Sequence, residues 1–395
     1  MKKITISTGG TGGHVIPAQI LYDYLSHKNQ VIITSDKRGI NYLNKKKYKV
    51  KQIDVPKLNK NIISFIPFLI KFTLSILNSY LFLDKNKIEI LISTGGYMSL
   101  PICLAAKFLN LKIFLFEPNL VIGRSNLFLL NYCEKIFTYT KKIKNFPKKM
   151  HHKIFVIKPL IKKEIFLLKK KLERKQMPFS ILLIGGSQGA KKFDNLFNDD
   201  LTKLSKKFKI KIYHQTSTQN IKKLKKFYVC NNIDFYVFSY RHDLHKIIKK
   251  CHFVITRSGA STLNELVFLE SPFLAIPYSH AKDDHQFFNA KYYVNKNLGW
   301  LIRETDIKKN FLYKFVANLI KNKKLIFQKK KNKFSKKKKI CTIFTRQMTG
   351  IQTLTNLTIS CRNEYKLSKI RNNTFCWNRW NRYEWTSINN DRIGF

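Results

Sequence analysis

The residues best suited to bind a nucleotide lie between Phe253 and Ala290. Small residues and hydroxyls from Ser258 to Thr262 open an expected helix, and the free N–H groups and positive dipole end of a helix start suit a phosphate. Farther along this helix, Glu265 can accept hydrogen bonds from two hydroxyls, as a ribose presents. Each feature alone also has an ordinary explanation, since glycine turns are common and an early Glu complements the helix dipole. Together they predict a site for a sugar nucleotide.

Glycine-rich loops follow short apolar runs at residues 9–13, 95–96 and 185–190. In such a loop no Cβ blocks a ligand, and backbone N–H groups can point at a phosphate. The first loop matches neither standard nucleotide fingerprint: the dinucleotide pattern needs Gly where Val15 stands, and the P-loop needs Gly-Lys-Ser/Thr. His14 stands at the mouth of this loop. A single His at a turn is more often structural, but beside a phosphate loop it is a candidate general base.

Apolar strand-like runs alternate with helix-forming segments along both halves of the chain, while the charged run 45–51 reads as a loop. The expected strands are residues 3–7, 31–35, 88–93, 112–116, 135–140, 153–157, 180–184, 210–215, 235–238, 253–255 and 273–277. This alternation predicts an α/β protein with two Rossmann-like, doubly wound domains that face a cleft. We place these domains at 1–160 and 161–335, with the boundary near the charged run 162–177. Ligands of such sheets bind at the carboxyl ends of the strands.

The chain has a formal net charge of +52, with 75 Lys and Arg against 23 Asp and Glu in 395 residues. Such a balance favours nucleic acid as a partner. The lysines, however, are spread along the whole chain, and abundant Phe with scarce Gly and Pro indicates an A/T-rich coding sequence. We therefore expect no nucleic-acid partner. Seven cysteines without paired spacing indicate free thiols in a reducing compartment.

Residues 62–83 form an apolar stretch with one charge, Lys71, and a length that would span a bilayer. Pro67 interrupts the stretch, and polar residues punctuate it. It also lies between two expected strands of one sheet, which a spanning helix would place on opposite sides of the membrane. We expect either an interfacial helix, with flanking lysines that suit a membrane surface, or a helix buried against the sheet.

Six motifs stand in the order of a known family. They are GGTGGH-x-x-PA at 9–18, GGY-x-S-x-P at 95–101, GGSQGA at 185–190, HQTS at 214–217, RSGA-x-T-x-x-EL at 257–266 and DDHQ-x-x-NA at 283–290. Over roughly residues 1–330 the chain closely resembles the bacterial N-acetylglucosaminyltransferases of peptidoglycan synthesis. The resemblance implies a GT-B fold and inverting transfer of GlcNAc from UDP-GlcNAc to the C4 hydroxyl of undecaprenyl-diphospho-N-acetylmuramoyl-pentapeptide. It implies no metal and no other cofactor, and a peripheral location at the cytoplasmic face of the inner membrane.

The resemblance also implies roles for single residues. By position, Thr11, Gly12 and Gly13 face the donor diphosphate, Asn119 and Gln286 hold the sugar, Ser187 binds phosphate, and Ala260, Ser261, Thr262, Leu263, Asn264 and Glu265 bind the nucleotide, with Glu265 on the ribose. His14 is the candidate base or proton relay, and Arg257 would support the nucleotide helix electrostatically.

Three positions depart from the family pattern. Pro118 replaces a Gln and removes an N–H donor. Ile161 stands where the family has a phosphate-binding Arg, and Lys158 or Lys162 would have to supply that charge without the Arg fork. Ser93 replaces the first glycine of the second loop. These changes indicate relaxed selection, so an inactive copy is one alternative reading.

From about residue 329 the composition changes to a Lys-rich run and then to residues 336–395, which show no periodicity. Back-translated and shifted by one base, 372–385 reads IIHFVGIGGIGMNG, which resembles the start of UDP-N-acetylmuramate–alanine ligase. We expect an aberrant, frameshifted and disordered tail; a basic, aromatic tail that binds nucleic acid is the alternative. For the whole chain, another GT-B lipid glycosyltransferase or a basic nucleic-acid-binding protein remain the rival functions.

Overall fold

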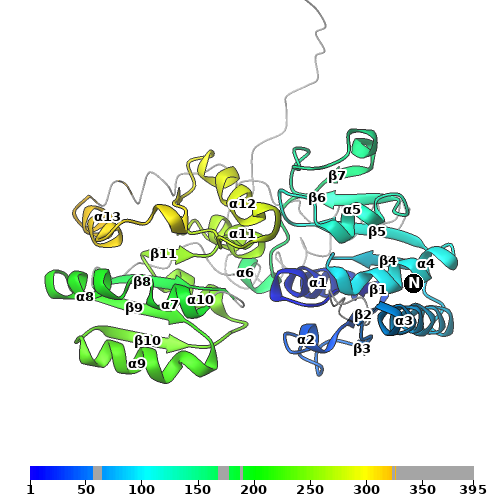
Figure 1. Ribbon diagram of the computed structural model, residues 1–395, viewed down its shortest axis with the longest axis horizontal. Coiled ribbons are helices and arrows are strands. Elements are labelled where there is room, and N and C mark those ends of the chain that lie inside the picture. The colour runs from blue at the N-terminus through cyan, green and yellow to red at the C-terminus, as the bar shows by residue number, and fades with distance from the viewer. Residues whose placement is uncertain (57–64, 168–177, 187–189, 323–324, 326–395) are drawn as a thin grey trace, which may run out of the picture. The chain divides into compact units, whose positions relative to one another are not determined.

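The computed structural model describes residues 1–56, 65–167, 178–186, 190–322 and 325. Residues 1–344 form one compact unit. Within the described part, two separate parallel β-sheets are each flanked by helices (Figure 1). The expected α/β class with two doubly wound sheets is therefore confirmed. The tail at 336–395 lies outside the described residues.

The first sheet has the strand order β3-β2-β1-β4-β5-β6-β7, and every pairing is parallel. Its strands are β1 (Lys3–Ser7), β2 (Gln30–Ser35), β3 (Val50–Gln52), β4 (Ile90–Ser93), β5 (Lys112–Glu117), β6 (Lys135–Thr138) and β7 (Ile154–Val156). The strand order reverses at β1, since the chain moves outward from it in both directions. The carboxyl ends of β1 and β4 therefore lie side by side, and the first two glycine loops leave the sheet next to each other.

The second sheet has the order β10-β9-β8-β11-β12-β13 and is also parallel throughout. Its strands are β8 (Phe179–Ile184), β9 (Ile210–Gln215), β10 (Asp234–Phe238), β11 (Phe253–Thr256), β12 (Phe273–Ala275) and β13 (Trp300–Leu301). Here the order reverses at β8, so the loops after β8 and β11 are neighbours at one edge.

Helices connect the strands as parallel pairing requires. The α-helices are α1 (Gly12–Leu25), α2 (Lys37–Ile40), α3 (Phe65–Lys85), α4 (Leu100–Phe108), α5 (Arg124–Leu129), α6 (Lys163–Leu167), α7 (Ala190–Asn195), α8 (Asn198–Lys207), α9 (Ile221–Cys230), α10 (Leu244–Lys250), α11 (Ala260–Phe268), α12 (His285–Val294) and α13 (Phe311–Lys321).

Alternate residues of the central strands pack into different cores. On β8, Ile181 and Leu183 join one buried cluster, whereas Leu182 and Ile184 join the cluster on the other face of the sheet. Successive side chains of a strand point to opposite faces, so a strand covered by helices on both sides is apolar at most positions. This explains why the strand runs were readable from the sequence.

The structure corrects three details of the expected local structure. Residues 45–49 lie outside helices and strands, as expected for a loop, but Val50 and Lys51 belong to the edge strand β3. Pro67 does not interrupt the apolar helix, since it lies in the first turn of described α3, where a missing N–H costs no helical hydrogen bond. Nor is α3 buried against the sheet: of its residues only Ser75, Ser79 and Leu83 are buried.

Candidate active site

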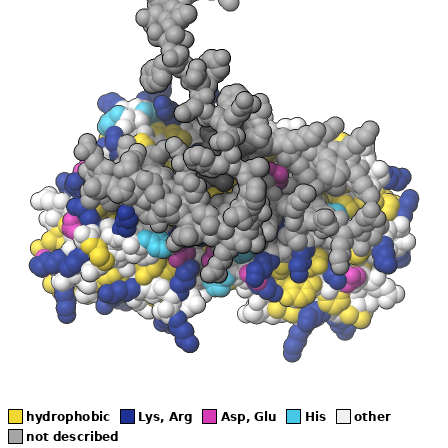
Figure 2. All heavy atoms as spheres, turned by 180° about the vertical axis from the view of Figure 1, so that it is seen from behind, with side chains coloured by type: hydrophobic (Ala, Val, Ile, Leu, Met, Phe, Trp, Pro, Cys, Tyr) yellow, Lys and Arg dark blue, Asp and Glu magenta, His cyan; other side chains and the backbone are white. Residues whose placement is uncertain are grey.

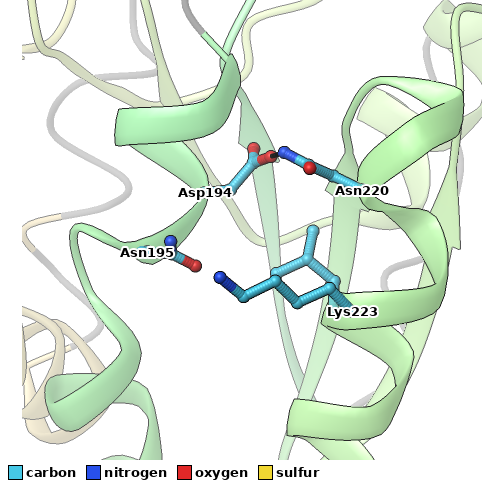
Figure 3. A pocket seen from close by; sticks show the side chains of 5 residues that line it. Asp194, Asn195, Asn220 and Lys223 are labelled. Carbon is cyan, nitrogen blue, oxygen red and sulfur yellow. Dashed lines mark hydrogen bonds between the residues drawn. The ribbon is translucent and has the colours of Figure 1, made fainter.

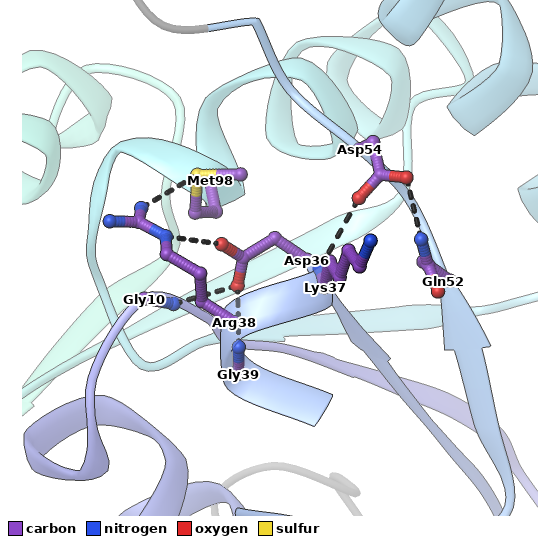
Figure 4. A network of polar contacts seen from close by, with 8 residues as sticks. All are labelled: Gly10, Asp36, Lys37, Arg38, Gly39, Gln52, Asp54 and Met98. Atoms are coloured by element: carbon purple, nitrogen blue, oxygen red, sulfur yellow. Dashed lines mark hydrogen bonds and ion pairs between the residues drawn. The ribbon is translucent and has the colours of Figure 1, made fainter. Parts of the chain in front are cut away.

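Asp36, at the start of α2, fixes the first glycine loop between β1 and α1 (Figure 4). Its Oδ1 accepts hydrogen bonds from the N–H groups of Gly10 at 2.8 Å and Gly39 at 3.0 Å. A Cβ at Gly9 would lie 2.7 Å from the same oxygen, so this close approach requires glycine. Arg38 Nε pairs with the other carboxylate oxygen at 3.1 Å. Sequence reasoning missed Asp36, although an acidic residue directly after the second strand was visible.

Thr11, Gly12 and Gly13 lie together at the start of α1, as the resemblance implied. Thr11 is the N-cap, and its side chain makes no capping hydrogen bond. The first N–H groups to bond back to its carbonyl are those of His14 and Val15. The N–H groups of Gly12 and Gly13 thus precede the hydrogen-bond ladder of a 14-residue helix, where a helix presents free donors and positive potential.

His14 joins the two glycine loops of the first sheet. Its Nδ1 lies 2.8 Å from the carbonyl oxygen of Thr94, at the end of β4. A Cβ at Gly95 or Gly96 would approach the imidazole to 3.4 Å, and both glycines have φ near +90° (+87° and +89°). The second loop therefore needs glycine because its backbone must turn under the His14 ring.

A buried carboxylate, Glu117, organises the loop that carries Asn119. Its Oε1 accepts from the backbone N–H and the side-chain amide of Asn119 at 3.1 and 3.0 Å. Its Oε2 accepts from Gly123 N at 2.8 Å and Asn126 Nδ2 at 3.0 Å. Asn126 in turn lies against Gly95, 3.2 Å from where a Cβ would stand. The three residues Glu117, Asn126 and Gly123 thus connect the Asn119 loop to the His14 loop, a role that sequence reasoning did not assign.

The nucleotide helix α11 begins at Ala260 after the N-cap Gly259. Ala260, Ser261 and Thr262 are partly exposed, so their side chains are available to a ligand. Leu263 and Asn264 are buried: Leu263 packs in the core, and Asn264 accepts a hydrogen bond from the Tyr293 hydroxyl. The Leu263 side chain therefore serves packing, and the Asn264 side chain is held inside the protein by Tyr293.

Glu265 is a buried carboxylate, only 8% exposed. Among the described residues, its side chain makes no hydrogen bond or ion pair. Burial raises its pKa; Lys162 partly offsets this effect, and Glu164 adds to it. An unpaired buried carboxylate is costly unless a ligand supplies donors. Two ribose hydroxyls would supply them.

Gln286, at the start of α12, is oriented by two backbone donors. Its Oε1 accepts from Ser258 N at 3.2 Å and Tyr278 N at 3.0 Å. These bonds fix which end of the amide faces the backbone. The Nε2 group consequently points away from both and makes no hydrogen bond to a described residue. It is available as a donor to a sugar hydroxyl.

Arg257, directly after β11, supports the strand ends rather than α11. Its Nη1 donates to Glu304 Oε2 at 2.7 Å and to the carbonyls of Ile276 and Pro277 at 3.3 and 3.1 Å. Its guanidinium also lies over the Phe193 ring. The expected electrostatic support of the nucleotide helix stays a prediction.

Two further expectations concern phosphate binding. Ser187 lies outside the described residues, which end at Gly186 and resume at Ala190. Ile161 is 1% exposed and packed in the interior, so it offers no charge. Lys162 Nζ lies 3.2 Å from the His242 carbonyl oxygen. Its charge partly offsets the rise that burial causes in the Glu265 pKa.

A second polar cluster lies in the other half, around Asp194 of α7. Asp194 Oδ1 accepts from His214 Nε2 at 3.2 Å, and Oδ2 accepts from Thr216 Oγ1 at 2.5 Å and Asn220 Nδ2 at 2.9 Å. His214 Nδ1 meets the Tyr228 hydroxyl at 2.8 Å. Asp194 and Asn220 also line a cavity of about 230 Å³ (Figure 3). The HQTS motif thus anchors α7, which follows the third glycine loop.

Solved structures of other proteins share this arrangement of two sheets. A solved structure of Acinetobacter baumannii MurG superposes with a TM-score of 0.69 at 21% identity and covers 89% of this chain and all of that one. A UDP-GlcNAc 2-epimerase from Neisseria meningitidis bound to UDP-GlcNAc gives a TM-score of 0.61 at 14% identity, over 89% of this chain and all of that one. These likenesses define the class by fold: a GT-B arrangement.

Sequence comparison then gives the family. The glycosyltransferase family 28 N-terminal domain matches residues 4–138, and the family 28 C-terminal domain matches residues 180–342. The chain therefore belongs to glycosyltransferase family 28.

Its curated relatives carry one name, UDP-N-acetylglucosamine–N-acetylmuramyl-(pentapeptide) pyrophosphoryl-undecaprenol N-acetylglucosamine transferase. The protein of Pelagibacter ubique is 47% identical over 84% of this chain and 93% of its own length. The protein of Rickettsia bellii is 32% identical over 86% of this chain and 96% of its own length. The similarity to relatives of this name extends over most of the chain.

Proposed function

We propose that this protein transfers GlcNAc from UDP-GlcNAc to the C4 hydroxyl of undecaprenyl-diphospho-N-acetylmuramoyl-pentapeptide, which yields the lipid-linked disaccharide precursor of peptidoglycan. The observation that carries the proposal is the 47% identity to a relative of that activity over 84% of the chain. The site is consistent with this proposal, because the diphosphate, the ribose and the sugar of UDP-GlcNAc each have a candidate partner of the right chemistry.

His14 is the proposed general base. The Thr94 carbonyl can only accept, so Nδ1 carries the ring proton and Nε2 of the neutral ring keeps its lone pair. Nε2 takes the proton of the acceptor C4 hydroxyl as that oxygen attacks the anomeric carbon of GlcNAc. The bond from this carbon to the β-phosphate oxygen breaks, and UDP leaves with the electron pair. Attack opposite to the leaving group inverts the anomeric centre.

The donor is proposed to be held by residues from both sheets. Glu265 accepts from the ribose hydroxyls, and the Nε2 group of Gln286 donates to a hydroxyl of the sugar. The N–H groups of Gly12 and Gly13 at the start of α1 stabilise the charge that develops on the diphosphate. Asn119 and Ser187 complete the proposed sugar and phosphate contacts.

Peripheral attachment to the cytoplasmic face of the inner membrane is proposed from α3. This 21-residue helix is long and apolar enough to cross a membrane by length and composition. Its exposed large side chains are Phe65, Ile66, Leu69, Ile70, Leu74, Leu77, Tyr80 and Leu81. One face nevertheless rests on the protein through the buried Ser75, Ser79 and Leu83. A helix packed along one side and apolar along the other suits the plane of a membrane surface, where a lipid-linked acceptor would be reached.

That nucleic acid is not a partner also stays a proposal. On the face in Figure 2, Lys and Arg side chains lie scattered on both sides rather than in one stripe. A nucleic-acid ligand would call for a clustered positive surface. The domain roles stay proposals as well: acceptor and membrane contacts for 1–160, donor binding for 161–335, and a frameshifted tail at 336–395, which resequencing of the locus would test.

The test is turnover with defined substrates. Purified protein is incubated with UDP-GlcNAc and the lipid-linked muramoyl acceptor, and UDP release is measured together with the disaccharide product. Diacylglycerol and other lipid acceptors serve as comparisons. Transfer to diacylglycerol but not to the muramoyl lipid would favour the rival lipid glycosyltransferase, and absence of turnover with every acceptor would favour an inactive copy.

A further inference from the structure

Asn289 of α12 has a buried side chain, 2% exposed, that hydrogen-bonds to segments of both halves. Its Oδ1 accepts from the backbone N–H of Leu120 at 2.9 Å. Its Nδ2 donates to Asn119 Oδ1 at 3.0 Å and to the Ser258 carbonyl at 3.3 Å. Both hydrogens of the amide and its oxygen are therefore used.

Two of the three partners of Asn289, Ser258 and Asn119, belong to different parts of the proposed donor site. Ser258 is the residue whose backbone N–H orients Gln286, at 3.2 Å. Asn119 is the first-half residue expected to hold the sugar, and Glu117 fixes it from the other side. Asn289 thus stands between the two candidate sugar-binding side chains.

The connection continues to His14. Glu117 accepts a hydrogen bond from Asn126. The side chains of Asn126 and His14 both lie against Gly95: a Cβ at Gly95 would be 3.2 Å from Asn126 Nδ2 and 3.4 Å from the imidazole. A continuous series of contacts therefore runs from Gln286 through Asn289 to the proposed base. No sequence motif alone indicated this path.

Only an asparagine fits the observed partners. Two of the atoms that face Asn289 are oxygens that must accept, and the third is an N–H that must donate. Aspartate would keep the size and the acceptor but would place a carboxylate oxygen against Asn119 Oδ1 and the Ser258 carbonyl. An apolar residue would leave all three partners unpaired in a buried place.

We propose that Asn289 is a positioning residue, which holds Asn119 of the first half and the Ser258–Gln286 pair of the second half in one arrangement around the donor sugar. The inference rests on the proposed function. Asn289 itself touches no substrate: it acts through the two residues that do. Binding of the sugar, rather than binding of the nucleotide, should therefore depend on it.

The experiment compares UDP with UDP-GlcNAc. Calorimetry measures the Kd of each for wild type, Asn289→Asp and Asn289→Ala. We expect the variants to bind UDP within about twofold of wild type but UDP-GlcNAc roughly tenfold more weakly, as the loss of one or two hydrogen bonds implies. An equal loss for both ligands, or no loss for either, would overturn the inference.

Asn29→Asp is a matched control. Asn29 is also a buried amide that accepts from a backbone N–H, that of Lys2, and donates to a carbonyl, that of Leu25. It lies away from the donor site, so we expect its change to lower thermal stability without altering the ratio of the two affinities. If Asn29→Asp changed that ratio as Asn289→Asp does, a general loss of stability would explain the effect and the inference would fail.

A measurement on the wild type covers the case in which the variants do not fold. The Leu120 amide hydrogen is held by Asn289, so its exchange with deuterium should slow more with UDP-GlcNAc than with UDP. Equal exchange with the two ligands would contradict the positioning role. A wild type that discriminates the two ligands but transfers no GlcNAc would refute the proposed function alone.

Discussion

The Nδ1 atom of His14 lies 2.8 Å from the carbonyl oxygen of Thr94, eighty residues away in the chain. A carbonyl oxygen has no proton to give, so the contact sets the tautomer of the neutral ring. The glycines that follow Thr94 allow the backbone to pass beneath the imidazole. One relationship between two loops therefore prepares the Nε2 atom as a base.

Replacing His14 by Gln should mainly reduce the rate. Gln keeps polar atoms near Thr94 but has no basic nitrogen, so kcat should fall by about 10²- to 10⁴-fold. The affinity for UDP should change little, because the His14 side chain makes none of the proposed nucleotide contacts. His27→Gln, at an exposed His of the same half, is the control. Steady-state kinetics would decide, and a His14 variant with unchanged kcat would exclude this residue as the base.

Glu265→Gln should weaken UDP binding by about 1–3 kcal/mol, since a charged acceptor for two hydroxyls is lost. The same variant should stabilise the free protein at neutral pH. Burial raises the pKa of Glu265 in the native state. The favourable contribution of Glu265 to folding is therefore present below its unfolded-state pKa and is lost as the pH rises through its native-state pKa. Thermal unfolding against pH, without ligand, measures this trend.

The matched control for that change is Glu134→Gln, at an exposed carboxylate of the first half. It should leave both UDP affinity and the pH dependence as in wild type. If Glu265→Gln bound UDP as tightly as wild type does, the carboxylate would have no role in ribose binding.

Asp194→Ala should destabilise the protein by about 3 kcal/mol, because the buried His214 and Thr216 and the partly buried Asn220 lose their acceptor. Burial alone would raise the Asp194 pKa, but hydrogen bonds from His214, Thr216 and Asn220 outweigh it, and the net pKa is lowered. The contribution of Asp194 to the free energy of unfolding is therefore present above its unfolded-state pKa and is lost as the pH falls through its native-state pKa.

Urea unfolding at several pH values tests the Asp194 prediction. Asp194→Asn should cost less than Ala and should remove this part of the acid dependence. Asp199→Ala, at an exposed carboxylate of the next helix, is the control. A stability loss no larger than that of the control would mean that the cluster does not hold α7.

Charged residues on α3 should release the protein from membranes. Ile70 and Leu77 are 57% and 51% exposed, and each apolar side chain taken into a bilayer contributes about 1.5–3 kcal/mol. Ile70→Glu with Leu77→Glu should lower binding to anionic vesicles by more than about tenfold. Val229→Glu, at a 63% exposed residue of the other half, should not.

The companion measurement for the α3 prediction uses a water-soluble acceptor analogue. Its turnover should be unchanged by the double substitution, because the exposed side chains of Ile70 and Leu77 are not among the proposed donor contacts. If the variant with Ile70→Glu and Leu77→Glu bound vesicles as tightly as wild type, α3 would not be the membrane contact.

The sequence by itself determined the elements whose information is local. Buried parallel strands such as β8 are apolar at nearly every position, and the glycine loops must lack side chains, so both are visible as short patterns. The edge strands β7 and β10 were readable, but β3 was not: it carries the exposed Lys51 and Gln52 and has only three residues. An edge strand has one sheet neighbour and a wet face, so little burial marks it.

Only the tertiary structure decided which polar residues work together. Three hydrogen-bonded pairs join residues up to 170 positions apart in the chain: Asp36 with Gly10, Glu117 with Asn126, and Asn289 with Asn119. Hydrogen bonds are short and directional, and a side chain's type does not say which distant partner the fold brings within 3 Å. Strand order, not local pattern, placed the carboxyl ends of β1 and β4 side by side, and from that placement the His14 site follows.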